Sequence, residues 1–116
     1  MSYITFDESI KMGRGNISYI EFVSDKQIDY FLRTGQEVEE NHEMIKNCME
    51  PGETAGHLKR IIYQIKLLKE DKPLAPFEVW YNNYDSYGDV YDGWHRIRAY
   101  QYMQYEKIPC NICYEA

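Results

Sequence analysis

The stretch from Asp92 to Tyr100 constrains this chain most, because it joins a strand pattern to a helix pattern through a single glycine. A β-forming run ends at Tyr91, and a helical pattern follows Gly93. The first backbone N–H groups of a helix have no partner within the helix, so a helix start attracts anions. His95 and Arg96 follow the corner directly and add charge-assisted donors. The stretch therefore predicts a phosphate-binding corner.

The size and charge of the chain narrow the classes of protein to consider. It has 116 residues, of which 44% are hydrophobic, so we expect one folded domain with a real core. The net charge of −6 repels the negatively charged nucleic-acid backbone, so DNA is a weak candidate as a partner. No apolar run approaches about 20 residues, and the N-terminus lacks the basic and apolar segments of a signal peptide. We expect a cytoplasmic protein with no membrane partner.

The cysteines predict neither a disulfide framework nor a metal site. Their count is three, which is odd, and nothing in the sequence suggests secretion. Cys110 and Cys113 form a C-x-x-C pattern, which is used for redox chemistry or for metal binding. They lie in a predicted strand, however, where positions three apart face opposite sides. We therefore interpret both as small hydrophobic residues and expect no metal.

The N-terminal half contains one strand pattern and two helix patterns. Residues 17–23 are rich in β-forming side chains. Ser24 and Gln27 form a capping box, which predicts a helix of about ten residues ending at Gly35. A second helix is predicted from residue 39 or 41 to residue 49, ended by a Pro-Gly pair. Its acidic residues are interpreted as a solvated face rather than as metal ligands.

Polar side chains accompany two further predicted helices. From His57 to residue 70, apolar residues recur at helical spacing, and Arg60 and Gln64 lie with His57 along one flank of that helix. By itself this flank is interpreted as ordinary polar surface. On the helix after the corner, Arg98 lies two positions after Arg96 and therefore points elsewhere. We expect it to reach a carboxylate or a second group of the ligand.

The order of elements after residue 55 predicts the fold class. Strands are predicted over residues 77–81, 87–91 and 108–114, with a hairpin loop at 82–86 and a helix reaching about residue 105. This order predicts a small α+β domain in which a mixed sheet packs against helices. Residues 55–116 form the core of the domain. Residues 1–54 supply an N-terminal strand and helices, which belong to the same domain or form an extension.

Three sequence motifs together identify a family resemblance. They are the strand start Pro76-Phe77-Glu78-Val79, the corner and helix from Asp92 to Gln101, and Ile108-Pro109-Cys110 leading into the last strand. In this order and spacing they resemble the ParB/sulfiredoxin-like superfamily over about residues 55–115. Residues 1–54 do not match clearly. The resemblance implies a ParB/sulfiredoxin-like fold whose glycine corner binds nucleotide phosphates, with ATP or CTP and Mg²⁺ as the candidate ligands.

The resemblance also implies which residues form the site. In sulfiredoxin-like members, polar residues on the helix before the first strand reach the phosphates. The resemblance therefore adds the polar flank of the predicted helix that starts at His57 to the site at the Gly93 corner. The candidate phosphate- or nucleotide-binding residues are Gly93, Trp94, His95, Arg96, Arg60, His57 and Gln64. Trp94 stands where sulfiredoxins carry their cysteine nucleophile, which argues against sulfiredoxin activity. Trp94 either stacks on a base or fills the site.

Two classes of function follow from the sequence. The first is a small domain that binds a nucleotide or phosphate group at the Gly93 corner, with NTPase or nuclease-like activity as an option. The second is a non-enzymatic protein-interaction module, for example of a phage or plasmid, that keeps the fold without the chemistry. In that case the surface rich in tyrosine and acidic residues binds a protein partner.

Overall fold

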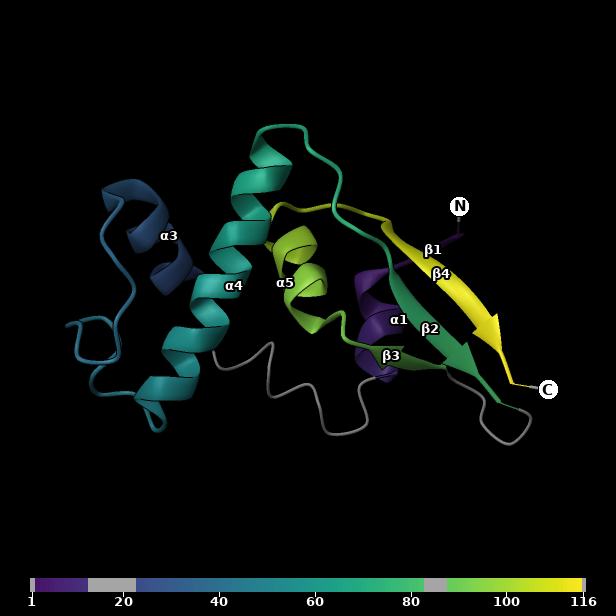
Figure 1. Cartoon of the computed structure of the whole chain (residues 1–116), viewed down its shortest axis with the longest axis horizontal. Coiled ribbons are helices and arrows are strands. Elements are labelled where there is room, and N and C mark those ends of the chain that lie inside the picture. The colour runs from purple at the N-terminus through teal and green to yellow at the C-terminus, as the bar shows by residue number, and fades with distance from the viewer. Residues whose placement is uncertain (1, 13–22, 83–87, 116) are drawn as a thin grey trace.

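The protein is a small α+β fold in which helices pack on one face of a mixed four-stranded sheet (Figure 1). A computed structural model describes residues 2–12, 23–82 and 88–115 of the chain. Within these ranges the elements are β1 (Ser2–Ile4), α1 (Phe6–Lys11), α3 (Asp25–Thr34), α4 (Pro51–Lys69), β2 (Phe77–Tyr81), β3 (Asp89–Tyr91), α5 (Trp94–Tyr102) and β4 (Ile108–Tyr114). The predicted α+β class and the mixed sheet are confirmed.

The sheet has the strand order β1-β4-β2-β3, with β4 in the interior. β4 pairs parallel with β2, and Phe77 lies opposite Cys110. β1 pairs antiparallel with β4, and β3 pairs antiparallel with β2. The parallel pair requires a crossover, and α5 provides it by leading from the β3 edge back to β4. The corner at Gly93 is therefore the point where the chain leaves the sheet for this crossover.

The elements form successive layers along the longest dimension of the molecule, which measures 48 × 32 × 19 Å. In Figure 1, α5 and α1 lie beside the sheet, α4 lies beyond α5, and α3 lies beyond α4. The core is continuous through these layers. It includes Ile28 and Phe31 of α3, Ile61 and Ile65 of α4, Ile97 and Ala99 of α5, and Val79, Ile108 and Cys110 of the sheet. Burial on two sides fixes α5 and α4 firmly relative to each other.

Local signals predicted several elements correctly. Ser24 caps α3 and forms the expected capping box with Gln27, and Gly35 ends this helix in a left-handed conformation, with φ of 68°. Such a φ favours glycine because it has no Cβ. β2 and β4 occupy the predicted residues. The predicted strand at residues 17–23 and the hairpin loop at 82–86 fall almost entirely outside the described residues.

The prediction of a helix from residue 39 or 41 to 49 is wrong, because this segment is a series of turns. Its Ile45 is fully buried, and its backbone N–H bonds to the carbonyl of His42. The Pro-Gly pair was read as a stop signal, but Pro51 instead occupies the first helical position of α4. A proline fits there because the N–H it lacks would have no helical partner. As a result, α4 begins six residues before His57, where the helical pattern was first read.

The N-terminal strand and helix were missed from the sequence. β1 adds a strand to the sheet beside β4, and α1 follows it after Thr5. Thr5 and Glu8 form a reciprocal capping box, in which each side chain accepts a hydrogen bond from the backbone N–H of the other. This pattern of threonine followed three residues later by glutamate is a recognised helix start. The first residues of the chain thus belong to the same sheet as the glycine corner.

Candidate functional site

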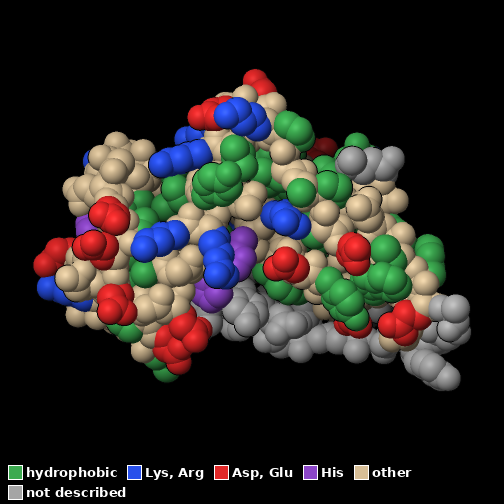
Figure 2. Space-filling model, viewed as in Figure 1, with side chains coloured by type: hydrophobic (Ala, Val, Ile, Leu, Met, Phe, Trp, Pro, Cys, Tyr) green, Lys and Arg blue, Asp and Glu red, His purple; other side chains and the backbone are tan. Residues whose placement is uncertain are grey.

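A cavity lies between α4 and the start of α5, and it consists of two adjoining hollows. The larger has a volume of about 480 Å³ and is lined by Glu53, Gly56, His57, Arg60, Asp92, Trp94 and His95. The smaller has a volume of about 300 Å³ and is lined by Arg60, Gln64, Asp92, His95 and Arg96. In Figure 2, Lys, Arg and His side chains gather near the middle of this face, with acidic side chains on either side. The cavity therefore combines most of the predicted site residues.

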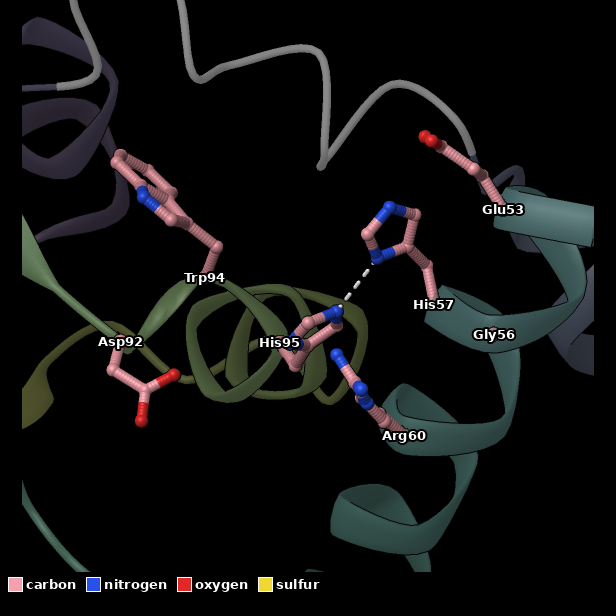
Figure 3. A pocket seen from close by; sticks show the side chains of 7 residues that line it. All are labelled: Glu53, Gly56, His57, Arg60, Asp92, Trp94 and His95. Carbon is pink, nitrogen blue, oxygen red and sulfur yellow. Dashed lines mark hydrogen bonds between the residues drawn. The ribbon is translucent and has the colours of Figure 1, made fainter. Parts of the chain in front are cut away.

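The flank of α4 supplies one wall, as the resemblance implied. The buried stripe of α4, which includes Ile61 and Ile65, faces the core and turns His57, Arg60 and Gln64 toward α5. In Figure 3 the side chain of Arg60 extends from α4 toward the ring of His95. These side chains lie three and four positions apart, which places them on one side of a helix. Of the three, His57 is buried, Gln64 is half-buried and Arg60 is exposed.

Gly93 acts mainly by allowing α5 to approach β2 closely. A Cβ built on Gly93 would lie 2.5 Å from Cγ of Phe77, so a larger residue does not fit without a shift. Its φ of −123° is open to any residue, whereas the preceding Asp92 has the left-handed φ of 50°. Gly93 itself does not line either hollow. Its contribution to the site is to place the first turn of α5, with its free N–H groups, beside the cavity.

His57 and His95 form a hydrogen-bonded pair across the cavity. Nδ1 of His57 and Nε2 of His95 lie 2.8 Å apart, as the dashed line in Figure 3 marks. The two rings are stacked, with centroids 5.0 Å apart and planes inclined by 30°. In a neutral imidazole one nitrogen donates and the other accepts, so the two rings must take complementary tautomers. Sequence reasoning named both histidines but did not predict that they bind each other.

The pair is held in its neutral form. Burial lowers the pKa of His95 to about 4, with His57 and the guanidinium of Arg60 acting in the same direction. Burial also lowers the pKa of His57, and Arg60 again adds to this effect while Glu53 opposes it. Both causes disfavour an additional positive charge. Near pH 7 the site therefore presents neutral imidazoles together with two permanently charged guanidinium groups.

Arg60 and Arg96 bring that permanent positive charge to the smaller hollow. Arg96 Nη1 donates to the backbone oxygen of Asp92 at the long distance of 3.4 Å. Within the part of the chain that the structure describes, neither guanidinium forms an ion pair with a carboxylate. Arginine presents several donors in a fixed plane that matches the oxygens of phosphate and carboxylate groups. The two arginines are thus positioned to bind an oxyanion from different helices.

Trp94 lines the larger hollow and does not fill it. Its side chain is 9% exposed and points away from His95 in Figure 3. Of the two predicted roles, filling the site is inconsistent with the open volume next to this residue. The indole forms part of an apolar wall beside the polar side chains.

Arg98 has a different role from that of the cavity residues. It reaches a carboxylate, as one of the two sequence alternatives expected, and this carboxylate belongs to Asp25 at a distance of 2.6 Å. The same nitrogen donates to the backbone oxygen of Val23 at 3.0 Å. Arg98 is 5% exposed and lies on the side of α5 that faces the start of α3. It therefore joins two helices and takes no part in the cavity.

Three cavity residues were missing from the predicted site: Glu53, Gly56 and Asp92. Glu53 lies four residues before His57 and seven before Arg60, which places it on the same flank of α4. This spacing would have identified Glu53 if the helix had been started at Pro51. Asp92 was recognised as part of the corner motif but was not assigned to the site. Both carboxylates partly offset the positive charge of the arginines.

The described part of the chain contains neither a disulfide nor a cluster of metal-binding side chains. Cys110 is buried, Cys113 is half-buried, and neither forms a disulfide. No group of three or more His, Cys, Asp or Glu residues in the described part of the chain could hold a metal ion. None of the described helices has both the length and the apolar character needed to cross a membrane.

Comparison of the chain with protein-family models, with curated proteins and with solved structures returned no match. The resemblance to the ParB/sulfiredoxin-like superfamily therefore stays a prediction from the sequence motifs.

Proposed function

We propose that the cavity between α4 and α5 binds the phosphate group of a nucleotide. The observation that carries this proposal is the convergence of Arg60 from α4 with His95 and Arg96 from α5 on one hollow of about 300 Å³. These side chains meet at the N-terminus of α5, where the backbone also favours an anion. The ParB/sulfiredoxin-like resemblance, with ATP or CTP and Mg²⁺ as ligands, supports the same proposal.

Each part of the cavity has a distinct task in this proposal. Arg60 and Arg96 donate to the phosphate oxygens in the smaller hollow, together with the first N–H groups of α5. The larger hollow, with Trp94 in its wall, receives the sugar or base. Asp92 lines both hollows and is the carboxylate placed to assist a Mg²⁺ ion that the nucleotide brings.

An NTPase or nuclease-like reaction is proposed as a property of the same site. Such a reaction requires a water molecule or hydroxyl group positioned to attack phosphorus. The imidazole of His95 lines the same hollow as the two arginines, so it is placed to accept the proton of that nucleophile in the molecules whose histidine pair is unprotonated. Release of inorganic phosphate from ATP or CTP, and cleavage of a short oligonucleotide, would reveal this activity.

Thermal-shift measurements with ATP, CTP, GTP and ADP, each with and without Mg²⁺, test the binding proposal. We expect at least one nucleotide to raise the melting temperature. The R60Q and R96Q variants should each bind about 10- to 100-fold more weakly, since hydrogen bonds to charged groups contribute about 1.5–3 kcal/mol. The R33Q variant is the matched control, because Arg33 is an exposed arginine on α3 that lines neither hollow.

Two outcomes would contradict the proposal. One is that no nucleotide stabilises the protein under any condition. The other is that R60Q and R96Q respond as strongly as R33Q. Stabilisation without turnover would support binding and reject the enzymatic part.

The outer face of the sheet supports a second candidate function, as a protein-interaction module. Side chains alternate along β2, so that Phe77 and Val79 are buried toward the helices while Glu78 faces outward. On this outer face, Tyr3 and Tyr91 are 54% and 51% exposed. Tyr91 lies opposite Glu78 on the neighbouring strand, and exposed tyrosines together with a carboxylate suit a partner segment with Lys or Arg side chains, through cation–π contacts and ion pairs.

A peptide titration followed by NMR separates this second candidate from the first. A lysine- and arginine-rich peptide should shift the resonances of Tyr3, Trp80 and Tyr91, whereas a glutamate-rich peptide of equal length should not. Equal responses to the two peptides, or shifts confined to the cavity residues, would reject the outer face as the docking surface.

A further inference from the structure

We infer that the His57–His95 pair is the proton acceptor of the cavity, so that a dianionic phosphate group binds together with one proton. This inference rests on the proposed function, because it describes how the same cavity takes its ligand. It commits the site to a terminal phosphate with two negative charges, as found in phosphomonoesters and nucleotides. A phosphodiester carries one negative charge and would draw the proton less strongly.

The geometry of the pair allows it to take one additional proton. In the neutral state a single hydrogen lies between Nδ1 of His57 and Nε2 of His95, at a separation of 2.8 Å. A further proton on either ring leaves this hydrogen bond intact and makes it charge-assisted, which strengthens it. A second additional proton would place two imidazolium groups in contact and break the bond. The pair therefore has the capacity for one proton.

The charged groups around the pair explain why the proton arrives with the ligand. From α4, Glu53 and Arg60 face the cavity, and from the corner and α5, Asp92 and Arg96 do so. The four charged side chains that line the two hollows, two positive and two negative, balance formally. A dianion beside the arginines brings two negative charges and changes this balance. The imidazolium form then becomes favourable at a pH where the empty site is neutral.

The direction of the pH dependence follows from this linkage. In the free protein the pKa of His95 is lowered to about 4, and a bound dianion raises it. Between the free and the bound pKa, binding takes up one proton, so the affinity falls as the pH rises, by up to about tenfold per pH unit. Above the pKa that the pair has with the anion bound, the affinity no longer varies with pH through the histidine pair.

An NMR titration of the wild-type protein with sodium sulfate tests the inference. Sulfate stays a dianion over the whole range from about pH 5.5 to pH 7.5, so its own titration does not contribute, and sodium chloride holds the ionic strength constant. We expect the dissociation constant to rise by up to about tenfold per pH unit in the lower part of this range. At about pH 6, sulfate should move the imidazole resonances of His57 and His95 toward the protonated form and leave those of His42 unchanged.

Variants assign the proton to the pair. The H57Q/H95Q double variant should bind sulfate with an affinity that no longer varies with pH. E53Q and D92N should still bind sulfate more tightly as the pH falls, with the window moved to lower pH because each carboxylate raises the pKa of its neighbouring histidine. An affinity that no longer varies with pH in either variant, while the imidazole resonances of the wild-type protein do not respond to sulfate, would assign the proton to a carboxylate and overturn the inference. The imidazole resonances of the wild-type protein decide the question without any variant, in case the double variant does not fold.

The outcomes separate this inference from the proposed function. Binding of sulfate with a pH-independent affinity and unchanged imidazole resonances would overturn the inference and leave phosphate binding in place. No binding of sulfate or of inorganic phosphate at any pH would overturn both. Binding that strengthens as the pH falls, with protonation of the pair, supports both.

Discussion

At the scale of single residues, Gly93 shows how one missing side chain positions the candidate site. A Cβ at position 93 would overlap the side chain of Phe77, so the glycine allows α5 to approach the sheet closely. His95 and Arg96 follow within the first turn of the same helix, so their place in the cavity depends on that approach. The glycine therefore serves the cavity from a buried position outside it.

Gly93→Ala should lower the free energy of unfolding by about 1–3 kcal/mol, because the added methyl group would overlap Phe77. Urea denaturation measures this change from the shift in midpoint, provided that the free energy of unfolding falls with urea concentration at the same slope in both proteins. Gly56→Ala is the matched control: nothing lies within 4 Å of the added Cβ, and the site is inside α4. Alanine there should stabilise the helix by about 0.5–1 kcal/mol. Equal effects of both substitutions would refute the packing role of Gly93.

At the scale of elements, Arg98 fixes α5 to the start of α3. Its guanidinium bonds to Asp25 and to the backbone of Val23, while Tyr102 on the same helix donates to Asp29. Arg98 is buried, whereas the side chain of Asp25 is 65% exposed. Loss of Arg98 therefore removes the buried donor of the Val23 carbonyl, whereas the exposed carboxylate of Asp25 can be solvated by water.

Arg98→Met should destabilise the protein by about 1.5–3 kcal/mol, which is the range for hydrogen bonds that involve a charged group. Arg33→Met offers a comparison, because Arg33 is an exposed arginine near the end of α3, and its replacement should stay within about 0.5 kcal/mol. Chemical denaturation of both variants provides the values. A cost for Arg98→Met no larger than that for Arg33→Met would show that the contact adds nothing to stability.

The elements also show which parts of the fold could be predicted from the sequence. α3, β2 and β4 were predicted because capping boxes and residue alternation are local signals. β1 has three residues, too few for a pattern, and it exists through its pairing with β4 more than 100 positions later. Pro51 was misread because a proline both ends helices and begins them, and only the context distinguishes the two uses.

The candidate site, too, could be predicted only as far as local sequence patterns allow. Helical spacing placed His57, Arg60 and Gln64 on one flank, and the corner motif contributed His95 and Arg96. The contact between the two histidines depends on how α4 packs on α5, which no local pattern contains. Glu53 was missed for a local reason, since it follows from where α4 begins.

At the scale of the whole molecule, the neutral histidine pair makes stability depend on pH. In the folded protein the pKa of His95 is about 4 and that of His57 is lowered, whereas an unfolded histidine titrates near 6.5. Between about pH 4 and 6.5 the unfolded chain therefore binds more protons than the folded protein. The free energy of unfolding should rise with pH in this window, by at most about 1.4 kcal/mol per pH unit for each histidine.

Urea denaturation between about pH 4.5 and 7, in buffers without phosphate or sulfate, measures this dependence. The H95Q variant should show a smaller slope than the wild-type protein, because it lacks the group with the larger shift. Carboxylates also titrate at the acidic end, and they contribute equally to both proteins. Parallel curves for the two proteins would mean that His95 is not neutralised by folding.

The placement of the two tryptophans gives each candidate surface its own optical reporter. The chain has two tryptophans: Trp94 lines the larger hollow, and Trp80 stacks on Tyr91 at the outer face of the sheet. In Trp80→Phe the indole emission comes from the cavity alone, and in Trp94→Phe it comes from the sheet alone. Fluorescence from these two proteins would show which surface a newly found ligand or partner occupies, before its chemistry is known.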